Sequence, residues 1–356
     1  MKVITINSSP RIGAGSCTEL LLSHLARGMR GAGAEVRTVN LKQKDVRSCL
    51  GCFSCWFKSP GRCIQKDDMT NELLPELLLS DLIVYATPLY YRTMNAVMHV
   101  FRERMLPISL PFSERRDGNR VFALRHKLSP SVWLSVCALP EQSEFDAFSD
   151  FLHRMNHPDV SIVAEIYRTS SEAMRHPAFS GRLHDILEAT ALAGKELVRS
   201  LKISPVTMGR IMQPLMDPEH MAIMGNLTCK TCLSEKLTLR EFFAGGMRPR
   251  PDSLEAFMAY SVLGLNADAA GGKKVILQFR FSGEVEGCCY FTLEKGGIKA
   301  AAGTSGKWDI AIEAPFELWA DIMTGKADGR EMFLQGKYRV EGDPFLMQEL
   351  FRRKGD

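Results

Sequence analysis

Strand and helix signals alternate along the first half of the chain, and this alternation restricts the possible folds more than any other feature. Short apolar runs typical of strands stand at 3–6, 35–39, 82–86, 132–137 and 161–166. Between them, segments such as 21–29 and 94–105 carry apolar residues at helical spacing. Because parallel neighbouring strands need crossover connections, the pattern predicts an α/β fold: a doubly wound parallel sheet with helices on both faces.

A sheet of this kind also predicts where a ligand binds. Ligands of open parallel sheets lie at the carboxyl ends of the strands. The loops after residues 6, 86 and 137 are therefore expected to surround one site.

The loop between the first strand and the first helix has the composition of a phosphate-binding loop. It runs from residue 8 to residue 18 with the sequence SSPRIGAGSCT. A helix N-terminus offers free amide groups and a positive dipole, and hydroxyls and an arginine can add contacts to a phosphate. Neither the Walker pattern nor the six-residue dinucleotide fingerprint is present. The alternative is a polar loop in which Ser16 or Thr18 caps the helix.

Four cysteines crowd into one short segment, Cys49-x2-Cys52-x2-Cys55-x7-Cys63. Compact thiolate spacing of this kind suits a cubane iron–sulfur cluster, although the last spacing is wide compared with the ferredoxin pattern. Structural zinc usually draws on two separated cysteine pairs and is the weaker interpretation. The alternative to a metal is a cysteine-rich loop with free thiols.

The first hundred residues resemble a known family. The motifs that carry the resemblance are Ser9-Pro10-Arg11, Gly15-Ser16-x-Thr18, the four-cysteine segment, and the run from Ala86 to Tyr91. Together they resemble the NADPH-dependent FMN reductases and iron–sulfur flavoproteins, whose fold is flavodoxin-like. Ser8 stands where a glycine is common in that family.

The resemblance implies a cofactor and its ligands. The FMN phosphate would be held by Ser9, Arg11, Ser16, Cys17 and Thr18. The isoalloxazine would be flanked by Pro88, Leu89, Tyr90 and Tyr91, and a 4Fe-4S cluster would be held by Cys49, Cys52, Cys55 and Cys63. The redox chemistry belongs to the cofactor, so no catalytic side chain is assigned. NAD(P)H would be the hydride donor, and the family favours a homodimer or tetramer.

The last third of the chain differs from the first. Strand-like runs at 275–281, 288–293, 298–302 and 308–312 are separated by glycine-containing turns, which predicts an antiparallel meander. Two short amphipathic helices are expected near 316–323 and 344–351. Trp308–Ile312, Trp319–Gly329 and Phe333–Asp343 resemble the sterol carrier protein type 2 family of lipid-binding domains. That family implies a smaller α+β domain with an apolar tunnel. The residues that either line such a tunnel or fill a core are Phe279, Phe281, Tyr290, Phe291, Ile310, Ile312, Trp319 and Met323.

Length and breaks divide the chain. A chain of 356 residues exceeds one ordinary core. We predict a flavodoxin-like FMN domain at 1–205, a connector at 206–235 and a sterol-carrier-like domain at 236–356. Pro205, Pro214 and Pro218 are expected to break any long helix in the connector and leave it irregular.

Three further segments are less specific. Arginines between 102 and 127 surround a long insertion, which we interpret as a solvated loop or dimer contact rather than a steering surface for an anionic cofactor. Asp67 and Asp68 are expected to cap the helix that follows. Cys229 and Cys232 read as simple loop cysteines.

Composition restricts the partners and the compartment. The net charge is +4 with no basic stripe, which argues against nucleic acid. No apolar run is long enough to span a membrane. The N-terminus does not read as a secretory signal, and ten cysteines in such a chain suit the reducing cytoplasm.

The predicted function is that of an NAD(P)H-dependent FMN oxidoreductase. Electrons would pass to a small-molecule or protein acceptor, and the second domain could hold an apolar acceptor such as a quinone or lipid. One alternative is an electron carrier without direct NAD(P)H activity. The other is a lipid-binding protein whose flavin senses redox state.

Overall fold

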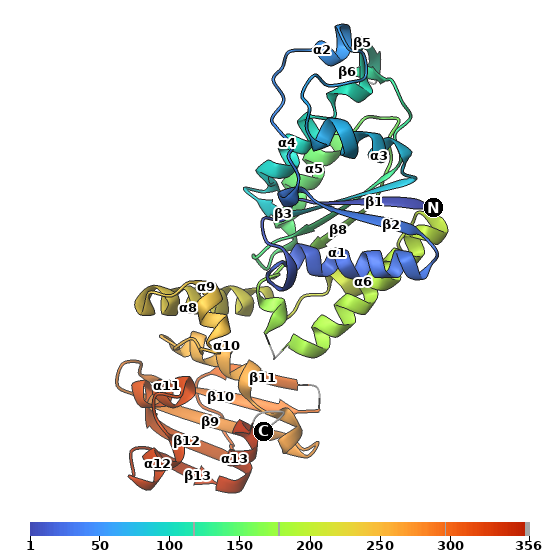
Figure 1. Cartoon of the computed structure of the whole chain (residues 1–356). Helices are drawn as coiled ribbons and strands as arrows, with labels where there is room; N and C mark the ends of the chain where they lie inside the picture. The colour runs from blue at the N-terminus through green and yellow to red at the C-terminus, as the bar shows by residue number, and fades with distance from the viewer. Residues whose placement is uncertain (117, 177–178, 296, 353–356) are drawn as a thin grey trace. The chain divides into compact units, whose positions relative to one another are not determined.

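The computed structural model describes residues 1–116, 118–176, 179–295 and 297–352. The chain divides into two compact units, Met1–Leu215 (unit 1) and Met216–Asp356 (unit 2) (Figure 1). Each unit has its own sheet and its own hydrophobic core.

Unit 1 is built on a parallel sheet. Its five main strands are β1 (Lys2–Asn7), β2 (Glu35–Asn40), β3 (Leu82–Tyr90), β7 (Ser131–Val136) and β8 (Ile162–Arg168). They lie in the order β2-β1-β3-β7-β8, and every neighbouring pair is parallel. A two-residue strand, β4 (Thr93–Met94), pairs antiparallel with the end of β3. This is the flavodoxin-like strand order, so the predicted doubly wound sheet is confirmed.

Helices cover both faces of this sheet. On one side lie α1 (Cys17–Gly31) and α6 (Ser180–Ser200), and on the other lie α3 (Leu74–Leu79), α4 (Ala96–Glu103) and α5 (Asp146–Met155) (Figure 1). α1 and α6 approach each other closely because both carry glycine at the contact. A Cβ on Gly28 would lie 1.8 Å from the carbonyl oxygen of Ala191, and one on Gly194 would lie 2.1 Å from that of Leu25.

Much of the insertion at 102–127 forms a hairpin rather than the expected loop, while the alternative expectation, a dimer contact, stays a prediction. Its strands are β5 (Ser109–Arg116) and β6 (Asn119–Leu124), which pair antiparallel. The short helix α2 (Ser54–Phe57) of the cysteine segment packs against it, with the ring of Trp56 5.2 Å from that of Phe122. The hairpin therefore supports the segment that carries Cys49 to Cys63.

The predicted irregular connector is wrong. Residues 205–235 form two helices, α7 (Pro205–Met212) and α8 (Pro218–Glu235). Pro205 and Pro218 occupy first helical positions, where proline's missing N–H costs nothing and its fixed φ suits the helix. The prolines start these helices, so Cys229 and Cys232 stand on α8 and not in a loop.

Unit 2 has a five-stranded sheet in the order β11-β10-β9-β12-β13. The strands are β9 (Val275–Ser282), β10 (Gly287–Glu294), β11 (Gly297–Ala302), β12 (Ile310–Pro315) and β13 (Arg339–Gly342). The predicted meander holds for β9, β10 and β11 but fails at β12, which pairs parallel with β9. β12 cannot follow β11 in the meander because it has crossed to the other edge of β9.

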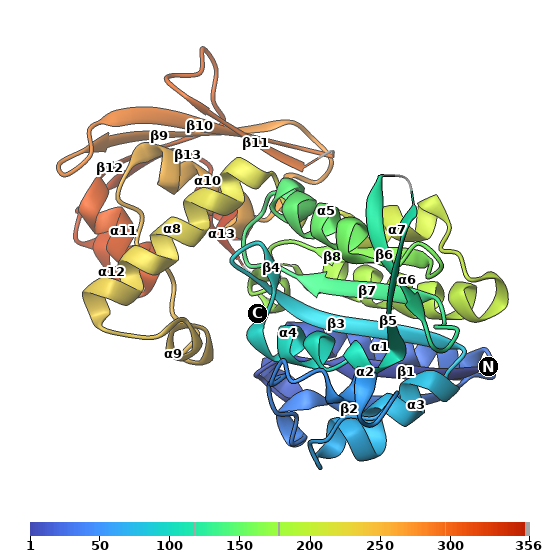
Figure 2. The ribbon, with the colours of Figure 1, turned by 90° about the horizontal axis from the view of Figure 1, so that it is seen from above.

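The helices of unit 2 lie on one side of its sheet (Figure 2). They are α8, α9 (Leu239–Ala244), α10 (Leu254–Gly264), α11 (Phe316–Thr324), α12 (Gly329–Leu334) and α13 (Pro344–Phe351). The expected helices near 316–323 and 344–351 are present as α11 and α13.

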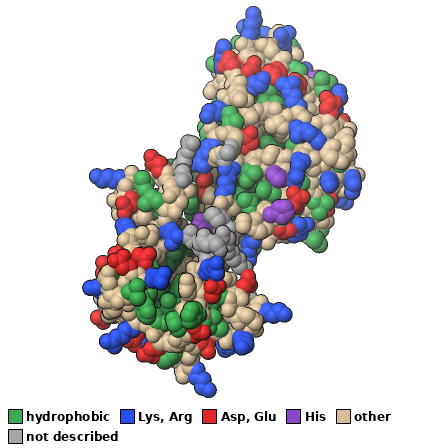
Figure 3. Space-filling view, turned by 60° about the horizontal axis from the view of Figure 1, so that its bottom comes forward, with side chains coloured by type: hydrophobic (Ala, Val, Ile, Leu, Met, Phe, Trp, Pro, Cys, Tyr) green, Lys and Arg blue, Asp and Glu red, His purple; other side chains and the backbone are tan. Residues whose placement is uncertain are grey.

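The surface of both units mixes charges of either sign. Figure 3 shows Lys and Arg side chains scattered among Asp and Glu over the visible face of each unit. Within the described part of the chain, no helix has both the length and the apolar character needed to cross a bilayer.

Candidate functional site

The carboxyl ends of β1 and β3 meet at the point where the strand order reverses. The amide of Ser8 donates to the carbonyl oxygen of Ala86 at 2.9 Å, which ties the loop after β1 to β3. The side chain of Asn95 donates from Nδ2 to the Ser8 carbonyl oxygen at 2.6 Å and caps α4 through the Met98 amide. The first two predicted loops therefore come together, as expected at such a switch point.

Ser16 acts as the cap of α1. Its Oγ accepts from the Glu19 amide at 3.0 Å and lies 2.9 Å from Ser9 Oγ, to which it donates. Ser9 Oγ also accepts from the Arg11 amide at 3.2 Å, so its own proton stays available to a ligand. The capping alternative is thus realised by Ser16, while Ser9 keeps a free donor.

The space over this loop is open. A Cβ built on Gly13 or on Gly15 would have no atom within 4 Å. The amides of Cys17 and Thr18 begin α1, and helix geometry leaves them without intrahelical acceptors. An open cradle above free amides at a helix N-terminus fits a phosphate group.

Arg11 lies beside the cradle in an ion pair. Its Nη1 is 2.8 Å from Oε1 of Glu172, and its side chain is 57% exposed. Cys17 is buried, with its Sγ donating to the Ser171 carbonyl oxygen at 3.1 Å, and burial raises the pKa of its thiol. Exposed Arg11 can turn to a phosphate, whereas the Cys17 side chain is committed elsewhere.

The segment expected to flank a flavin ring ends in a strained turn. Pro88 is buried, Leu89 is half-buried, and Tyr90 and Tyr91 are exposed, Tyr91 completely. Tyr91 and Arg92 have φ of 49° and 59°, the left-handed region that side chains seldom adopt. Strained backbone conformations of this kind are concentrated at ligand sites, where the surrounding structure holds the residues in place.

The loops after β7 and β8 complete the same edge. The Ser171 amide donates to the Cys137 carbonyl oxygen at 2.8 Å, and the Ser170 amide donates to that of Leu139 at 2.9 Å. Because Ser171 also accepts from Cys17, the third predicted loop joins the first two through one residue.

The four cysteines of the segment 49–63 lie within electrostatic reach of one another. The pKa of Cys55 is raised, first by burial and then by the neighbouring thiols of Cys63, Cys49 and Cys52. Cys52 is exposed, and hydrogen bonds from Ser54 lower its pKa.

Beneath the cysteine segment lies a buried ion pair that sequence reasoning missed. Arg104 contacts Asp67 through both Nη atoms, at 2.5 and 3.0 Å, and their side chains are 1% and 0% exposed. Arg104 also donates to the carbonyl oxygen of Arg47 and to Thr70 Oγ1, at 2.7 and 3.1 Å. Asp67 caps the helix as expected, since its Oδ1 accepts from the Thr70 amide, although its main partner is Arg104. The expected cap by Asp68 is wrong, because its carboxylate accepts from the Asp45 amide instead.

This ion pair faces Cys63. Burial would lower the pKa of Arg104, but the hydrogen bond with Asp67 and the nearby Cys63 thiol outweigh it, and the pKa is raised. The Nε–H group of Arg104 is buried with no acceptor among the described residues. A buried N–H group that lacks an acceptor and lies beside a thiol can donate a hydrogen bond to a cluster sulfur or to a thiolate.

The donor set fits iron–sulfur chemistry. Four thiols on one segment have the right ligand type, and a cubane holds its thiolates further apart than one metal ion does. Across the described ranges, no three Cys, His, Asp or Glu side chains are close enough to bind a single metal ion. The described residues therefore show four neighbouring thiols but no formed metal or cluster site, so the cluster stays a prediction.

In unit 2 the expected tunnel residues pack against one another. Phe279, Phe291, Ile310 and Ile312 are fully buried, and the rings of Phe279 and Trp319 are 5.1 Å apart. Further ring contacts join Phe257, Phe281, Phe316 and Phe351. Tyr290 and Met323 are half-buried. All of these residues except Tyr290 form the core between the sheet and the helices. Tyr290 stands on β10 between the buried Cys289 and Phe291, so it points to the other face of the sheet, and the expectation that it lines a tunnel or fills the core is wrong.

Comparisons with known families agree with this division. Residues 1–124 match the family described as NADPH-dependent FMN reductase, and residues 266–352 match the SCP-2 sterol transfer family. Unit 1 therefore contains a domain of the FMN reductase family, whose members are oxidoreductases. Unit 2 contains an SCP-2 domain.

Two curated relatives share the N-terminal region. An iron-sulfur flavoprotein of Archaeoglobus fulgidus is 37% identical over 107 residues, which are 30% of this chain and 46% of that protein. An iron-sulfur flavoprotein of Methanocaldococcus jannaschii is 30% identical over 115 residues, which are 32% of this chain and 57% of that protein. The chain thus spans about half the length of the curated relatives it matches.

Solved structures were also matched over part of the chain. One is an NAD(P)H:quinone oxidoreductase from Methanothermobacter marburgensis, 16% identical with a TM-score of 0.42, covering 55% of this chain and 96% of that one. Another is an FMN-dependent NADH-azoreductase from Bacillus anthracis in complex with FMN. It is 13% identical with a TM-score of 0.41, and the match covers 55% of this chain and 99% of that one.

Proposed function

We propose that the chain is an NAD(P)H-dependent FMN oxidoreductase that delivers electrons to an apolar acceptor. The observation that carries the proposal is the open cradle at the N-terminus of α1, next to the strained turn after β3. Both lie at the carboxyl edge of the sheet, where cofactors of this fold class bind.

The cradle would hold the FMN phosphate. The amides of Cys17 and Thr18 would donate to its oxygens, and so would the hydroxyls of Ser9 and Thr18. Ser16 would act through the helix cap, since its proton already goes to Ser9. Arg11 would leave Glu172 to pair with the phosphate.

The turn after β3 would receive the isoalloxazine. Pro88 and Leu89 offer apolar contact, and Tyr90 and Tyr91 are exposed rings that can stack on a flat cofactor. When bound, FMN would accept hydride from NAD(P)H and release the electrons singly or in pairs. The protein's part is to hold the ring and to exclude competing reactions.

The cysteine segment would hold a 4Fe-4S cluster through Cys49, Cys52, Cys55 and Cys63. The match to the FMN reductase family, residues 1–124, includes this segment, and the Nε–H group of Arg104, which has no acceptor among the described residues, suits a sulfur acceptor. A cluster would make one-electron transfer the route out of the flavin. The ten free thiols are in keeping with a reducing, cytoplasmic location.

The SCP-2 domain would present the acceptor. A quinone or lipid is the expected class, because that domain's interior is apolar and aromatic. A homo-oligomer is proposed as the working form, on the family resemblance of unit 1.

The first experiment is an oxygen-free absorption spectrum of the purified chain, with flavin, iron and labile sulfide measured together. The proposal expects bound FMN and about four irons per chain. Cys63→Ala should lose the iron and keep the flavin, whereas Cys229→Ala, at an exposed position of α8, should lose neither. A chain that binds no flavin after FMN is added would refute the central proposal.

Stopped-flow mixing with NADPH and NADH then separates the mechanism from its alternatives. Bleaching of the flavin followed by steady turnover with menadione supports the reductase. A flavin that is not reduced by either nucleotide indicates an electron carrier. Reduction without turnover by any quinone leaves a redox-sensing lipid-binding protein.

A further inference from the structure

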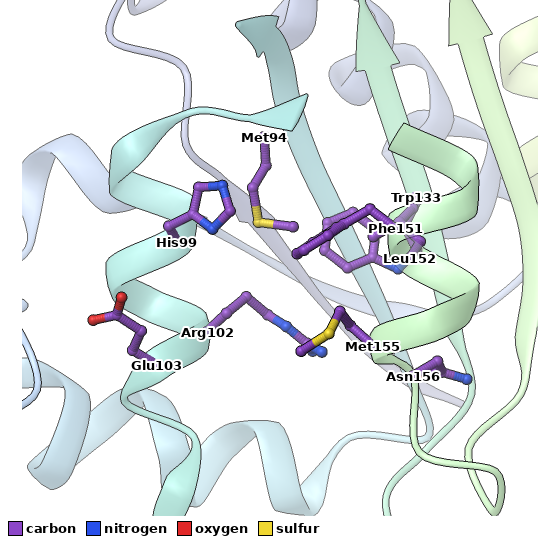
Figure 4. Close-up of a pocket in the computed structure, with 9 residues that line it drawn as sticks. All are labelled: Met94, His99, Arg102, Glu103, Trp133, Phe151, Leu152, Met155 and Asn156. Atoms are coloured by element: carbon purple, nitrogen blue, oxygen red, sulfur yellow. The ribbon is translucent and has the colours of Figure 1, made fainter. Parts of the chain in front are cut away.

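A pocket of about 230 Å³ opens between α4 and α5, on the face of the sheet opposite α1. Its floor is Trp133 of β7. The other lining residues are Met94, His99, Arg102, Glu103, Phe151, Leu152, Met155 and Asn156 (Figure 4). It draws on neither the phosphate cradle nor the cysteine segment, so it is a separate site.

Arg102 brings a positive charge to this apolar surrounding. Its guanidinium lies over the rings of Tyr85 and Trp133, 5.4 and 5.7 Å from their centroids. Its polar contacts are weak, 3.5 Å from Nη1 to the Tyr85 hydroxyl and 3.6 Å to Met105 Sδ. Among the described residues, no ion pair within 4.0 Å joins the Arg102 guanidinium to a carboxylate, and its hydrogen bonds are the two just given.

An arginine placed this way is prepared for an anion. Stacking on rings fixes the guanidinium plane and leaves most of its N–H donors without acceptors. A planar carboxylate matches that fork with two parallel hydrogen bonds. The stacking also lowers the entropy lost when a ligand binds, since the side chain is already ordered.

The walls and the size of the pocket define the rest of the ligand. Phe151, Leu152 and Met155 supply apolar contact on the α5 side (Figure 4). A volume of about 230 Å³ lies below the usual range for drug-sized ligands, roughly 300–1,000 Å³, so a flavin or dinucleotide is too large. The fit is to a single ring or a short chain.

Glu103 is the one acidic residue of the lining. It is exposed, and Figure 4 shows its carboxylate turned away from the guanidinium of Arg102. It would weaken binding of an anion without blocking it, because an exposed charge is well screened by solvent.

We propose that this pocket binds a small aromatic carboxylate, with the carboxylate on Arg102 and the ring against Phe151 and Met155. The site lies next to the proposed flavin turn in the sheet, because Met94 of β4 pairs with Leu89 of β3. The proposal does not depend on flavin binding, so its test can succeed or fail by itself.

The test uses benzoate as the probe and the full chain as the protein. Binding is followed by calorimetry and by tryptophan fluorescence, which Trp133 in the pocket floor reports. We expect a Kd on the order of 1 mM, and benzamide, the neutral analogue, should bind about tenfold more weakly. Absence of saturable binding up to roughly 30 mM would overturn the proposal.

Variants assign the binding to the pocket. Arg102→Gln should weaken benzoate about tenfold, whereas Arg154→Gln, an exposed arginine of α5, should change it little. Glu103→Gln should tighten it. Met155→Trp, which fills the pocket and keeps Arg102, should abolish it, and circular dichroism verifies that each variant is folded.

Two results would contradict the assignment. The first is benzoate binding that is unchanged in both Arg102→Gln and Met155→Trp. The second is a loss of benzoate binding when the protein concentration is raised and sedimentation velocity shows that the chain self-associates. That outcome would mean that a second copy of the chain covers this face.

Discussion

Replacing Asp67 with asparagine should destabilise unit 1 by about 3–5 kcal/mol at pH 7. The substitution keeps the shape of the side chain but leaves the guanidinium of Arg104 buried and without a counter-charge. Removing one partner of a buried pair costs that much because the remaining charge has lost its compensation. Arg104 also positions the Arg47 carbonyl, two residues before Cys49, so the cysteine segment should loosen as well.

The lowered pKa of Asp67 accounts for the part of this effect that depends on ionisation of the carboxyl group. Burial alone would raise it, but hydrogen bonds from Arg104 and from the amides of Arg47 and Thr70 outweigh burial and lower it to about 2. Relative to the ordinary value of 3.8, at about 1.4 kcal/mol per pKa unit, the ionised form gains about 2–3 kcal/mol.

The pH dependence follows with a defined sign. A carboxylate with a lowered pKa stabilises the folded state above its ordinary pKa, and this contribution is lost as the pH falls from about 4 through about 2. The difference between the wild-type chain and Asp67→Asn should therefore be full at pH 7 and should narrow near pH 2.

Urea unfolding at several pH values, followed by tryptophan fluorescence, measures the transition of unit 1. Asp45→Asn is the matched control, because its ion pair with Arg47 is more than half exposed and should contribute under about 1 kcal/mol. The double variant Asp67→Leu with Arg104→Met should recover much of the loss. A loss below about 1 kcal/mol for Asp67→Asn at pH 7 would refute the reasoning.

Three further predictions concern single residues. Gly28→Ala should lower the free energy of unfolding by about 2 kcal/mol, because the added Cβ would clash with the backbone of α6. Gly31→Ala is the control: the nearest atom to its Cβ is 3.8 Å away, so thermal unfolding should show a neutral or stabilising effect. In the iron-free chain, iodoacetamide at pH 8 should modify exposed Cys52 long before Cys289, because burial raises the pKa of Cys289 to about 12. Mass spectrometry of the peptides gives the order of modification, and equal rates would contradict the prediction. Asn95→Ala should cost about 2 kcal/mol of stability and weaken FMN binding several-fold, because it removes both the cap of α4 and the hydrogen bond to the Ser8 carbonyl oxygen. Flavin fluorescence measures the affinity, and an unchanged affinity would show that the hydrogen bond to Ser8 does not affect the cofactor site.

The sequence predicted the sheet of unit 1 well, for a physical reason. Parallel strands are buried on both faces and read as continuous apolar runs, so β1, β3 and β7 stand out from the amphipathic helices. A candidate phosphate-binding loop could be proposed from the sequence because it is local: one loop and one helix end contain all of it.

Features that depend on distant partners were not predictable in the same way. Asp67 and Arg104 are 37 residues apart, and nothing in either neighbourhood indicates the other. Asn95 stood in a recognisable place, directly before the amphipathic run at 96–103, so its role as a cap could have been found. The hydrogen bond from Asn95 to the Ser8 carbonyl oxygen could not have been found in this way. The helices at 205–235 were missed because proline was taken as a breaker, and not as a starter.

The parallel pairing of β12 with β9 affects how unit 2 can be made. β9, β10 and β11 can form as soon as residues 275–302 have left the ribosome, because each pairs with its neighbour in sequence. One side of β9 then stays unpaired until β12 arrives, more than thirty residues after β9 began. During that interval an apolar strand has a free edge, which other chains can extend. A chain interrupted before residue 310 would keep that edge permanently, and it should aggregate although three strands of its sheet are complete.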